Sequence, residues 1–388
     1  MYCVGVIVEL NPFHNGHKLH IDETRKTTGC KYIVAIMSGN FVQRGEPALC
    51  DKWQRTRMAL LNGVDIVIEL PLQYVISGAD YFARGSVGLL EATGVVDTLS
   101  FGSEHGDIKA ILDAANILAC EPPLYKENLR RALNSGVSFA AARGDALAAC
   151  LATVPDGVLT KPNNCLAIEY CKSLMLLNSN ITPITTHRTP SGTSATAIRK
   201  AILHSGTGSV CSTMPQNTFD ILCSNEHFAQ LDDYSNIVRH LIYTRPDLLS
   251  NMSEGLGNRI KAMCGQHLKL SALLAAVKTK RYTFTRLQRE ILKLLLSADK
   301  IDMYENAGGP QYIRVLGFRR HASAFVGEIT KKASLPVITH GAEMDRLISN
   351  GGEPAAMLLQ EFVAGDVYSL ATKTSVYKSE RGTAMVIL

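Results

Sequence analysis

Residues 8–17 read Val-Glu-Leu-Asn-Pro-Phe-His-Asn-Gly-His and connect an apolar run to a polar segment. The apolar residues 2–8 predict a short buried parallel strand, and residues 15–28 have the composition of a helix. His14 and His17 stand three apart, so their imidazoles lie on one face at the start of that helix. The glycine between them lets a ligand approach the backbone, while the first amides of the helix can donate to phosphate. The stretch therefore predicts an ATP site in which imidazoles stabilise a transferring phosphoryl group.

The same two histidines fit two plainer interpretations. A His-x-x-His pair also occurs at metal sites and at polar helix starts that bind nothing. A metal ion needs a third and a fourth ligand, and the nearest acidic residue, Glu9, lies on the other side of Pro12. We therefore expect no protein metal centre here. The choice between a nucleotide site and a bare helix start depends on the rest of the chain.

The first half of the chain alternates between strand-like and helix-like segments. Such alternation predicts a doubly wound α/β domain with a parallel sheet, in which ligands bind beyond the carboxyl ends of the strands. The segments 38–40 and 102–104 follow two strand ends, so we expect one site assembled from several loops. The expected strands are 2–8, 32–37, 65–68, 98–101 and 182–186, and the expected helices are 15–28, 52–62, 79–92 and 107–119.

A second candidate phosphate site begins at Ser194. The hydroxyls of Ser194 and Thr196 precede Arg199 at the start of a predicted helix. Hydroxyls and amides at a helix start bind phosphate oxygens, and a guanidinium supplies compensating charge. The alternative is a capped helix whose Arg199 and Lys200 are solvated. Arg188 ends the preceding strand, where it can reach the adenine, ribose or phosphate part of a nucleotide.

Residues 161–164 read Lys-Pro-Asn-Asn and precede an apolar run. They lie in a mostly helical stretch, about 120–178, which we interpret as an insertion that covers the sheet. An asparagine here can cap the helix that follows, or its amide can bind the nucleotide. These residues alone leave both alternatives open.

Basic residues are concentrated in the second half of the chain. Residues 1–200 contain 19 Lys/Arg and 18 Asp/Glu, residues 201–388 contain 21 and 17, and residues 256–333 contain 15 and 5. Cationic side chains neutralise phosphates and aromatic planes stack on bases, so this pattern predicts an RNA-binding surface. The alternative is a solvated helical face over a core stripe. The expected RNA-binding residues are Lys278, Lys280, Arg281, Tyr282, Arg286 and Arg289.

The composition is that of an ordinary soluble enzyme. With 388 residues, 46% of them hydrophobic and 19% charged, the chain is long enough for two cores. No apolar run reaches about 18 residues and the first ten residues lack a basic leader, so we expect neither a membrane span nor a signal peptide. Ten cysteines without a Cys-x-x-Cys pair predict reduced thiols in a cytoplasmic protein.

Together these motifs carry a resemblance to a known family. The run 9–17 resembles the His-x-Gly-His signature of the nucleotidyltransferase superfamily, and residues 194–200 resemble its second, Ser/Thr-rich signature ending in Ile-Arg. More narrowly, the chain resembles the bacterial tRNA(Met) cytidine acetate ligases, although Leu10 stands where an aromatic residue is expected. The further segments that fit are 37–41, 43–47, 67–71, 101–104 and 162–164.

This resemblance implies a reaction in two steps. Acetate attacks the α-phosphate of ATP and pyrophosphate leaves, with Mg²⁺ shielding the phosphates. The N4 amine of the wobble cytidine, in the anticodon loop of elongator tRNA(Met), then attacks the acetyl-adenylate and becomes N4-acetylcytidine. The resemblance further implies a Rossmann-like nucleotidyltransferase domain at 1–200 that activates acetate with ATP, followed by a mainly helical, basic tRNA-binding domain at 201–388. Within the latter, residues 232–243 and 282–298 look helical, and 367–370 is a candidate strand.

The resemblance also assigns residues to roles. It implies that His14 and His17 stabilise the α-phosphate, and that Ser194, Thr196 and Arg199 bind the leaving pyrophosphate, so that the expected catalytic residues are the two histidines and Arg199. The expected ATP-binding residues are Ile7, Val8, Glu9, Leu10, Asn11, Pro12, Phe13, His14, Asn15, Gly16, His17, His20, Gly102, Asn163, His187, Arg188, Ser194 and Thr196.

Two other functional classes remain open at this point. An adenylyltransferase acting on a small phosphate-bearing cofactor precursor shares the His-x-Gly-His signature but needs no basic second domain. A non-catalytic RNA-binding protein that kept a nucleotide-binding fold binds ATP without turnover. Exchange of ATP with pyrophosphate that depends on a carboxylic acid separates the acid-activating enzyme from both.

Overall fold

One mixed β-sheet forms the centre of the structure. A computed structural model describes residues 2–151, 158–187, 194–250, 252, 255–279, 282–296, 308–372 and 380–388. Within these residues, eight strands lie in one sheet in the order β10-β8-β5-β2-β1-β6-β7, with β9 paired to β8. Their bounds are β1 Cys3–Val8, β2 Tyr32–Ser38, β5 Ile66–Leu70, β6 Thr98–Ser103, β7 Thr182–His187, β8 Ile313–Phe318, β9 Val337–Ile338 and β10 Val386–Ile387.

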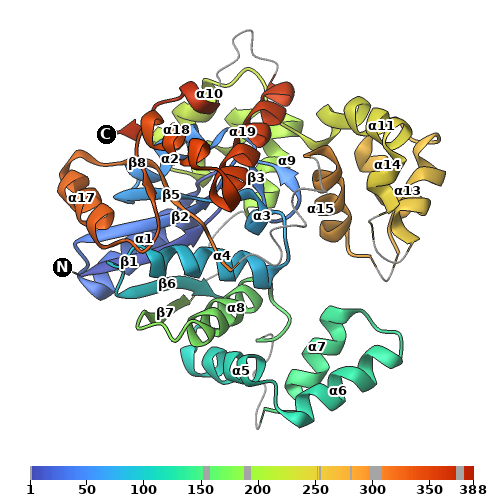
Figure 1. The fold of residues 1–388 in the computed structure, drawn as a ribbon, viewed down its shortest axis with the longest axis horizontal. Coiled ribbons are helices and arrows are strands. Elements are labelled where there is room, and N and C mark those ends of the chain that lie inside the picture. The colour runs from blue at the N-terminus through green and yellow to red at the C-terminus, as the bar shows by residue number, and fades with distance from the viewer. Residues whose placement is uncertain are drawn as a thin grey trace.

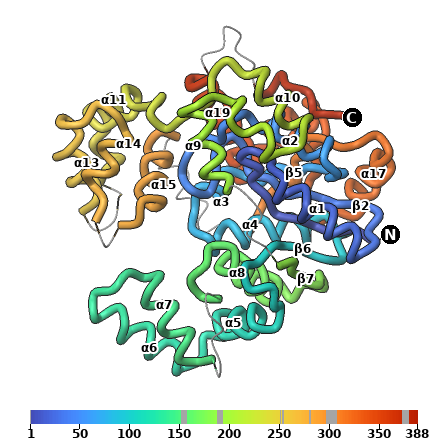
Figure 2. The backbone as a smooth tube through the Cα atoms, turned by 180° about the vertical axis from the view of Figure 1, so that it is seen from behind, coloured from blue at the N-terminus to red at the C-terminus, as the bar shows by residue number. Residues whose placement is uncertain are grey.

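The N-terminal part confirms the predicted parallel sheet with helices on both faces. β1 lies between β2 and β6 and runs parallel to both. Helices α1 (Asn15–Thr28), α2 (Lys52–Leu61) and α9 (Ala195–Ser205) cover one face, seen in Figure 2, and α4 (Ala79–Ala92) covers the face seen in Figure 1. Because both faces are buried, the central strands are apolar at successive positions.

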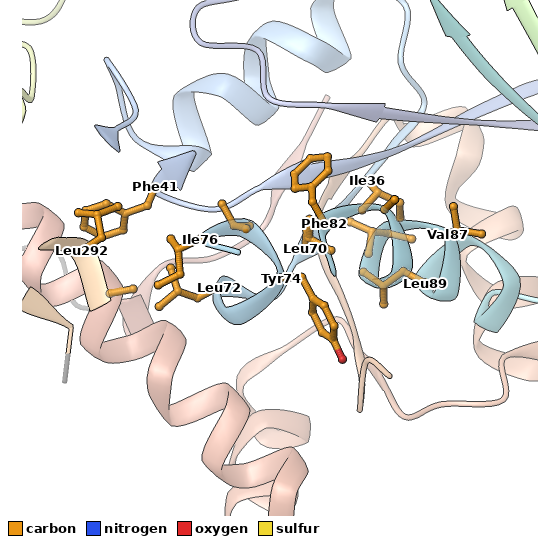
Figure 3. Packing of buried hydrophobic residues seen from close by; sticks show 14 of the residues in the cluster. Ile36, Phe41, Leu70, Leu72, Tyr74, Ile76, Phe82, Val87, Leu89 and Leu292 are labelled. Carbon is orange, nitrogen blue, oxygen red and sulfur yellow. The ribbon is translucent and has the colours of Figure 1, made fainter. Parts of the chain in front are cut away.

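Alternate residues of the central strands fill two separate hydrophobic clusters. In β2, Ile33 and Ala35 join one cluster together with Ile21 of α1. Val34 and Ile36 point the other way and join the cluster that includes side chains of α4, as Figure 3 shows for Ile36. This period-two alternation fixes the register of the sheet, because a slip by one residue would exchange the two cores.

The C-terminal part of the chain returns to the sheet. β8 pairs antiparallel with β5, and β9 and β10 each pair with β8. The expectation of a separate helical domain from residue 201 to the end is therefore wrong for β8, β9 and β10. The physical reason is that β8, all of whose residues are buried, covers the edge of β5 that would otherwise stay unpaired.

Residues 367–370, the candidate strand, lie instead inside helix α19 (Gly352–Thr372). Ala364, Tyr368 and Ala371 are buried at the spacing of one helix face. The short apolar run was therefore part of a helical stripe and not of a strand.

A buried group of charges holds this C-terminal return in place. Lys52 Nζ lies 2.5 Å from Glu69 Oε1, and Arg314 Nη1 lies 3.0 Å from Glu69 Oε2 and 2.8 Å from Glu380 Oε1. Lys52 also pairs with Glu380. Burial, reinforced by the charge of Glu69, raises the pKa of Glu361 to about 8. Burial thus favours the neutral form of Glu361 beside the ion pairs of Lys52 and Arg314 with Glu69 and Glu380.

A helical bundle lies beside the sheet, at one end of the molecule in both views (Figures 1 and 2). Its helices are α11 Ser235–Thr244, α12 Pro246–Ser250, α13 Leu256–Cys264, α14 Leu270–Val277 and α15 Phe284–Leu295. It buries Val238, Ile260, Leu273 and Ile291. The expected helices at 232–243 and 282–298 correspond to α11 and α15, and residues 297 and 298 lie outside the described residues.

The expected insertion is helical and consists of α6 (Pro123–Asn134), α7 (Phe139–Ala148) and α8 (Pro162–Leu176). α8 packs against α4 and against α5 (Ile108–Cys120), so it covers the α4 face of the sheet. α6 and α7 pack against each other farther from the sheet (Figure 1).

The remaining elements are short or connect these layers. None of the helices in the described part of the chain combines the length and apolar character that a membrane span requires. The remaining bounds are β3 Phe41–Val42, β4 Glu46–Pro47, α3 Leu72–Val75, α10 Gln216–Cys223, α17 Ser323–Lys332 and α18 Gly341–Asn350, with 3₁₀ helices at Thr207–Thr213, Leu231–Tyr234, Arg320–Ala322 and Glu380–Gly382.

Candidate functional site

A cavity of about 530 Å³ opens beyond the carboxyl ends of β1 and β6. It gathers most of the residues expected to bind ATP, as the fold class predicts. Those lining it are Ile7, Val8, Glu9, Leu10, Asn11, His14, Gly16, His17, His20, Gly102, Asn163, Ser194, Thr196 and Arg199. Pro12, Phe13, Asn15 and His187 do not line it, and Arg188 lies outside the described residues.

Four residues expected to bind ATP do not line the cavity, because each is buried elsewhere, bonded elsewhere or exposed at a strand end. Phe13 is completely buried in the core below α1, and Pro12 connects it to Asn11 through a cis peptide bond. Asn15 donates from Nδ2 to the carbonyl oxygen of Ser212, at 3.0 Å. His187 is exposed at the end of β7. Pro12, Phe13 and Asn15 belong to the connection between β1 and α1 without lining the cavity.

The two signature histidines close the first turn of α1. His14 is the N-cap residue, and its Nδ1 accepts a hydrogen bond from Gly16 N at 3.0 Å. His17 Nδ1 accepts from His14 N at 3.2 Å, which completes a reciprocal capping box. The two rings stack with centroids 3.8 Å apart. Since each Nδ1 accepts a hydrogen bond, each neutral imidazole carries its own proton on Nε2. The site thus presents two imidazole donors of fixed tautomer.

The loop before α1 presents a further donor. Leu10, at φ 51°, turns the chain after β1, and Asn11 is buried at the wall of the cavity. Asn11 Oδ1 accepts from Leu49 N at 2.7 Å, whereas Asn11 Nδ2 has no hydrogen-bond partner within the described residues. A buried amide without a partner is costly, so this donor suits an oxygen of a bound ligand. His20 lines the same cavity, and its Nδ1 lies 2.9 Å from Thr186 Oγ1, which links α1 to β7.

Arg199 joins the second signature to the first. Its Nη1 donates to the carbonyl oxygen of Asn11 at 2.9 Å, and its Nη2 lies 2.7 Å from Glu46 Oε1. The alternative of a solvated Arg199 is therefore wrong, because the guanidinium is held between two loops at the cavity. Ser194 caps α9, because its Oγ accepts a hydrogen bond from Ala197 N at 3.2 Å. Ser194 also lines the cavity, so the same residue can cap the helix and face a ligand.

The segments 101–104 and 162–164 hold each other in place. Asn163 Nδ2 donates to Glu104 Oε1 at 2.6 Å. Asn164 Oδ1 accepts from the backbone N of Glu104 at 2.9 Å and from that of His105 at 3.3 Å. The alternative of an asparagine cap is wrong, because α8 already begins at Pro162 with Lys161 as its N-cap. Asn163 instead lies at the cavity, anchored by Glu104.

Arg55 is the main residue that the sequence did not reveal. This side chain of α2 is completely buried, and its Nη1 donates to the carbonyl oxygens of Glu9 (2.7 Å) and Ser38 (3.2 Å). Nε donates to the carbonyl oxygen of Cys50 at 3.1 Å, and Nη2 donates to that of Gly39. Burial lowers the pKa of Arg55 from its usual value. Nothing in the sequence marks this arginine, because an arginine within a helix is usually a surface residue.

Glu9 is the only acidic residue among the described residues that line the cavity. Its Oε1 accepts from the backbone N of Gln43 at 2.6 Å. Burial raises the pKa of Glu9, and the charge of Glu46 adds to that effect. The hydrogen bond from Gln43 and the charges of Arg199 and Arg44 act in the opposite direction, but the net shift is upward.

Apolar side chains line another part of the cavity. Phe82, Phe101, Leu166 and Tyr170 belong to this part, and the rings of Phe101 and Tyr170 have centroids 5.9 Å apart. Burial raises the pKa of the Tyr170 hydroxyl far above its usual value, and the nearby charge of Glu9 contributes. The cavity therefore combines a cationic, hydrogen-bonding part with a part suited to a flat, uncharged group.

The loop between β3 and β4 joins the cavity to the helical bundle. Gly45 has φ +82°, and a Cβ there would lie 2.5 Å from the backbone N of Arg289 in α15. Arg289 Nη1 donates to the carbonyl oxygen of Gln43 at 3.2 Å. Leu292 of the same helix belongs to the buried cluster that contains Phe41 (Figure 3). The loop that carries Gln43 and Arg44 into the cavity thus rests directly on α15.

The structure shows how exposed some of the expected RNA-binding residues are. Arg289 is half-buried and holds the β3–β4 loop, and Tyr282 is only 7% exposed, with the guanidinium of Arg286 lying 5.4 Å from the centre of its ring. The Tyr282 ring belongs to the core stripe and is not open for base stacking. Lys278 is exposed as expected, and Lys280 and Arg281 lie outside the described residues.

The described residues contain no group of three or more His, Cys, Asp and Glu side chains that could hold a metal ion. A single carboxylate at the cavity is too few oxygen ligands for a resident Mg²⁺. The donor set suits anionic oxygens rather than a cation.

Comparison with known proteins gives a consistent result along the whole chain. Residues 1–383 match the family model of the HIGH Nucleotidyl Transferase. A tRNA(Met) cytidine acetate ligase from Thermoanaerobacter sp. (strain X514) is 41% identical over 97% of this chain and 96% of its own length. Another from Acetivibrio thermocellus is 38% identical over 97% of both chains.

A solved structure agrees with the fold at similar coverage. The crystal structure of Thermotoga maritima TmcAL bound with alpha-thio ATP superposes with a TM-score of 0.93 and 32% identity, covering 100% of both chains. The apo form of the same protein gives a TM-score of 0.92, with 32% identity over 100% of this chain and 99% of that one.

The contact between Gly45 and α15 yields a prediction with a matched control. Gly45 and Gly136 share a φ of +82°, but nothing lies within 4 Å of a Cβ at Gly136. We expect Gly136→Ala to lower the free energy of unfolding by about 1 kcal/mol through backbone strain alone. Gly45→Ala should cost at least about 2 kcal/mol more, because its Cβ meets the backbone of α15. Urea unfolding measures both values, and equal losses would contradict the contact.

Proposed function

Because this chain belongs to the tRNA(Met) cytidine acetate ligase family within the HIGH nucleotidyl transferases, we propose that it performs the two-step reaction of an acetate ligase. It activates acetate with ATP as acetyl-adenylate and transfers the acetyl group to N4 of the wobble cytidine in elongator tRNA(Met). The observation that carries the proposal is the pair of stacked imidazoles at the N-terminus of α1, facing a cavity at the carboxyl edge of the sheet.

In the first step an acetate oxygen attacks the α-phosphorus, and the bond to pyrophosphate breaks. The phosphoryl oxygens gain charge as this happens. The Nε2 protons of His14 and His17 and the first amides of α1 stabilise that charge, and Asn11 Nδ2 supplies a further donor. Arg199 lies on the side of the pyrophosphate, positioned by Glu46 and by the carbonyl of Asn11.

Mg²⁺ enters this proposal as a companion of the nucleotide. The described residues at the cavity include no group that could hold a cation, so in this proposal the phosphates of ATP hold the ion. It shields phosphate charge in that position, and no residue of this chain is assigned to it.

The second step needs an activated acid, because acetate is a poor acyl donor and the cytosine amine is a poor nucleophile. A mixed anhydride formed inside the cavity is protected from water until the amine arrives. A base in an anticodon loop can be turned out of its stack without melting a duplex. The apolar part of the cavity, with Phe82, Phe101 and Tyr170, offers such a base a flat surface.

The helical bundle offers the RNA a positively charged surface. Lys261 in α13, Lys269 before α14 and Lys278 after it are exposed, and so is Arg259. The bundle lies beside the β3–β4 loop that reaches the cavity, through the contact of Gly45 with α15. An RNA bound along these helices would therefore lie close to the cavity.

Two substitutions test the imidazoles while keeping the structure of the helix start. His14→Asn retains an N-cap oxygen for Gly16 N, and His17→Gln retains the reciprocal bond of the capping box. We expect each to lower acetate-dependent ATP–pyrophosphate exchange by about 10² to 10³-fold, because a donor to the transition state is lost. His204→Asn, at an exposed position of α9, is the control and should retain exchange.

Full exchange in both histidine variants would remove the imidazoles from the mechanism. Exchange that proceeds without acetate but with a phosphate-bearing cofactor precursor would support an adenylyltransferase instead. Binding of ATP without any exchange would support the non-catalytic RNA-binding alternative.

The RNA surface is tested by removing charge from the bundle. The triple variant Lys261→Ala, Lys269→Ala and Lys278→Ala should bind tRNA about tenfold or more weakly at moderate salt, and the slope of log K against log salt should fall by about 2. Lys331→Ala in α17, at the opposite side of the molecule in Figure 1, is the control for a lost surface charge. Filter binding across a salt series measures the effect, and an unchanged slope would exclude this surface.

A further inference from the structure

The position of Glu9 is unusual for a site that binds a polyphosphate. The cavity is lined by three histidines and two arginines, which suit phosphate oxygens, and Glu9 is the only carboxylate among the described residues there. A carboxylate repels phosphate. The acceptor capacity that Glu9 retains beside its bond from Gln43 suits an N–H group of a ligand better than a phosphate oxygen.

Glu9 is held firmly from two sides. The backbone N of Gln43 donates to its Oε1 at 2.6 Å, and Arg55 donates to its backbone carbonyl at 2.7 Å. A carboxylate accepts up to about four hydrogen bonds, so the bond from Gln43 orients the group and leaves capacity for a ligand. The side chain is thus presented to the cavity in one orientation, as a positioned base requires.

Glu9 shares the cavity with groups of both kinds. Phe101 and Tyr170 line it, and so does Arg199. The electrostatic influence of Glu9 reaches Tyr170, and that of Arg199 reaches Glu9. A base bound against the aromatic side chains would therefore lie in the same cavity as the carboxylate and the activated acid.

Gln43 connects Glu9 to the helical bundle. Gln43 donates to the Glu9 carboxylate from its N–H, and its carbonyl oxygen accepts from Arg289 of α15. The helical bundle, the β3–β4 loop and Glu9 therefore form a continuous chain of contacts. Glu9 is thus linked by two hydrogen bonds to the bundle that we propose binds the RNA.

We propose that Glu9 is the base that accepts the proton of the N4 amine during acetyl transfer; this inference rests on the function proposed above. The nitrogen lone pair forms a bond to the acetyl carbon, and the bond from that carbon to the AMP oxygen breaks. AMP leaves with the electron pair of that bond. The proton lost from nitrogen goes to the Glu9 carboxylate and then to solvent, which leaves a neutral amide.

The raised pKa of Glu9 agrees with this role, since a carboxylate with a higher pKa binds a proton more strongly. The groups that act on it are Glu46, which raises its pKa, and Arg199 and Arg44, which lower it. The charge of Glu9 in turn acts to raise the pKa of Tyr170 and of Arg55. The base must be ionised, so the transfer rate should rise with pH through the pKa of Glu9 and then level off.

The experiment compares the two steps in wild type and Glu9→Gln. Glutamine has the same shape, and its Oε1 still accepts from Gln43 N, so the β3–β4 loop keeps its support. Acetate-dependent ATP–pyrophosphate exchange reports the first step. Single-turnover transfer of labelled acetyl groups to elongator tRNA(Met), between about pH 5 and 9, reports the second. In Glu9→Gln we expect the transfer rate to fall about 10²-fold or more, which is at least about 30-fold more than any fall in the exchange rate. The rise of the transfer rate with pH should disappear. Glu9→Asp should recover part of the transfer rate.

Equal losses in both steps would overturn the proposal, because Glu9 would then act on ATP or on the fold. So would unchanged transfer in Glu9→Gln. The pH profile of wild-type transfer is an independent check that needs no variant, and a rate that does not rise with pH contradicts a carboxylate base. Wild-type protein that shows no acetate-dependent exchange at all would instead contradict the proposed function itself.

Discussion

The site depends on one buried guanidinium. Arg55 donates to the carbonyl oxygens at the ends of β1 and β2, through Glu9, Ser38 and Gly39, and to Cys50 before its own helix. These carbonyls belong to three loops that would otherwise diverge beyond the sheet edge. The buried guanidinium needs hydrogen-bond acceptors to offset its lost hydration, and the buried carbonyl oxygens need donors. The arginine and the carbonyl groups therefore satisfy each other. The carbonyl of Glu9, where the chain leaves β1 toward the signature histidines, is thus held by a residue outside the signature.

From this anchor the contacts extend in two directions. One leads through Asn11 to Arg199, which ties the second signature to the first. The other leads from Glu9 to Gln43 and on to Arg289 of α15. The first direction borders the cavity in which we propose that the nucleotide is activated. The second connects that cavity to the bundle that we propose binds the RNA, so the two halves of the proposed reaction meet at Glu9.

The sequence predicted the parts of this account that depend on local pattern. The apolar strands, the helix start at His14 and the capping role of Ser194 follow from periodicity and residue type, and the strand ends place the signatures at one edge. Long-range pairings were not predictable. The antiparallel return of β8 to β5, the burial of Tyr282 and the contacts of Arg55 join residues far apart in the sequence, and no local spacing records such pairs. The contact of Arg289 with Gln43 was unpredictable for the same reason, since Gln43 lies in the other half of the chain.

The central claim is that one cavity activates acetate and delivers it to a cytidine. The most direct measurement incubates the protein with ATP, radiolabelled acetate and elongator tRNA(Met), digests the RNA to nucleosides and separates them. The account predicts that the label appears in N4-acetylcytidine and that its appearance requires ATP. Label in any other nucleoside, or no label in RNA while acetate-dependent ATP–pyrophosphate exchange proceeds, would contradict it.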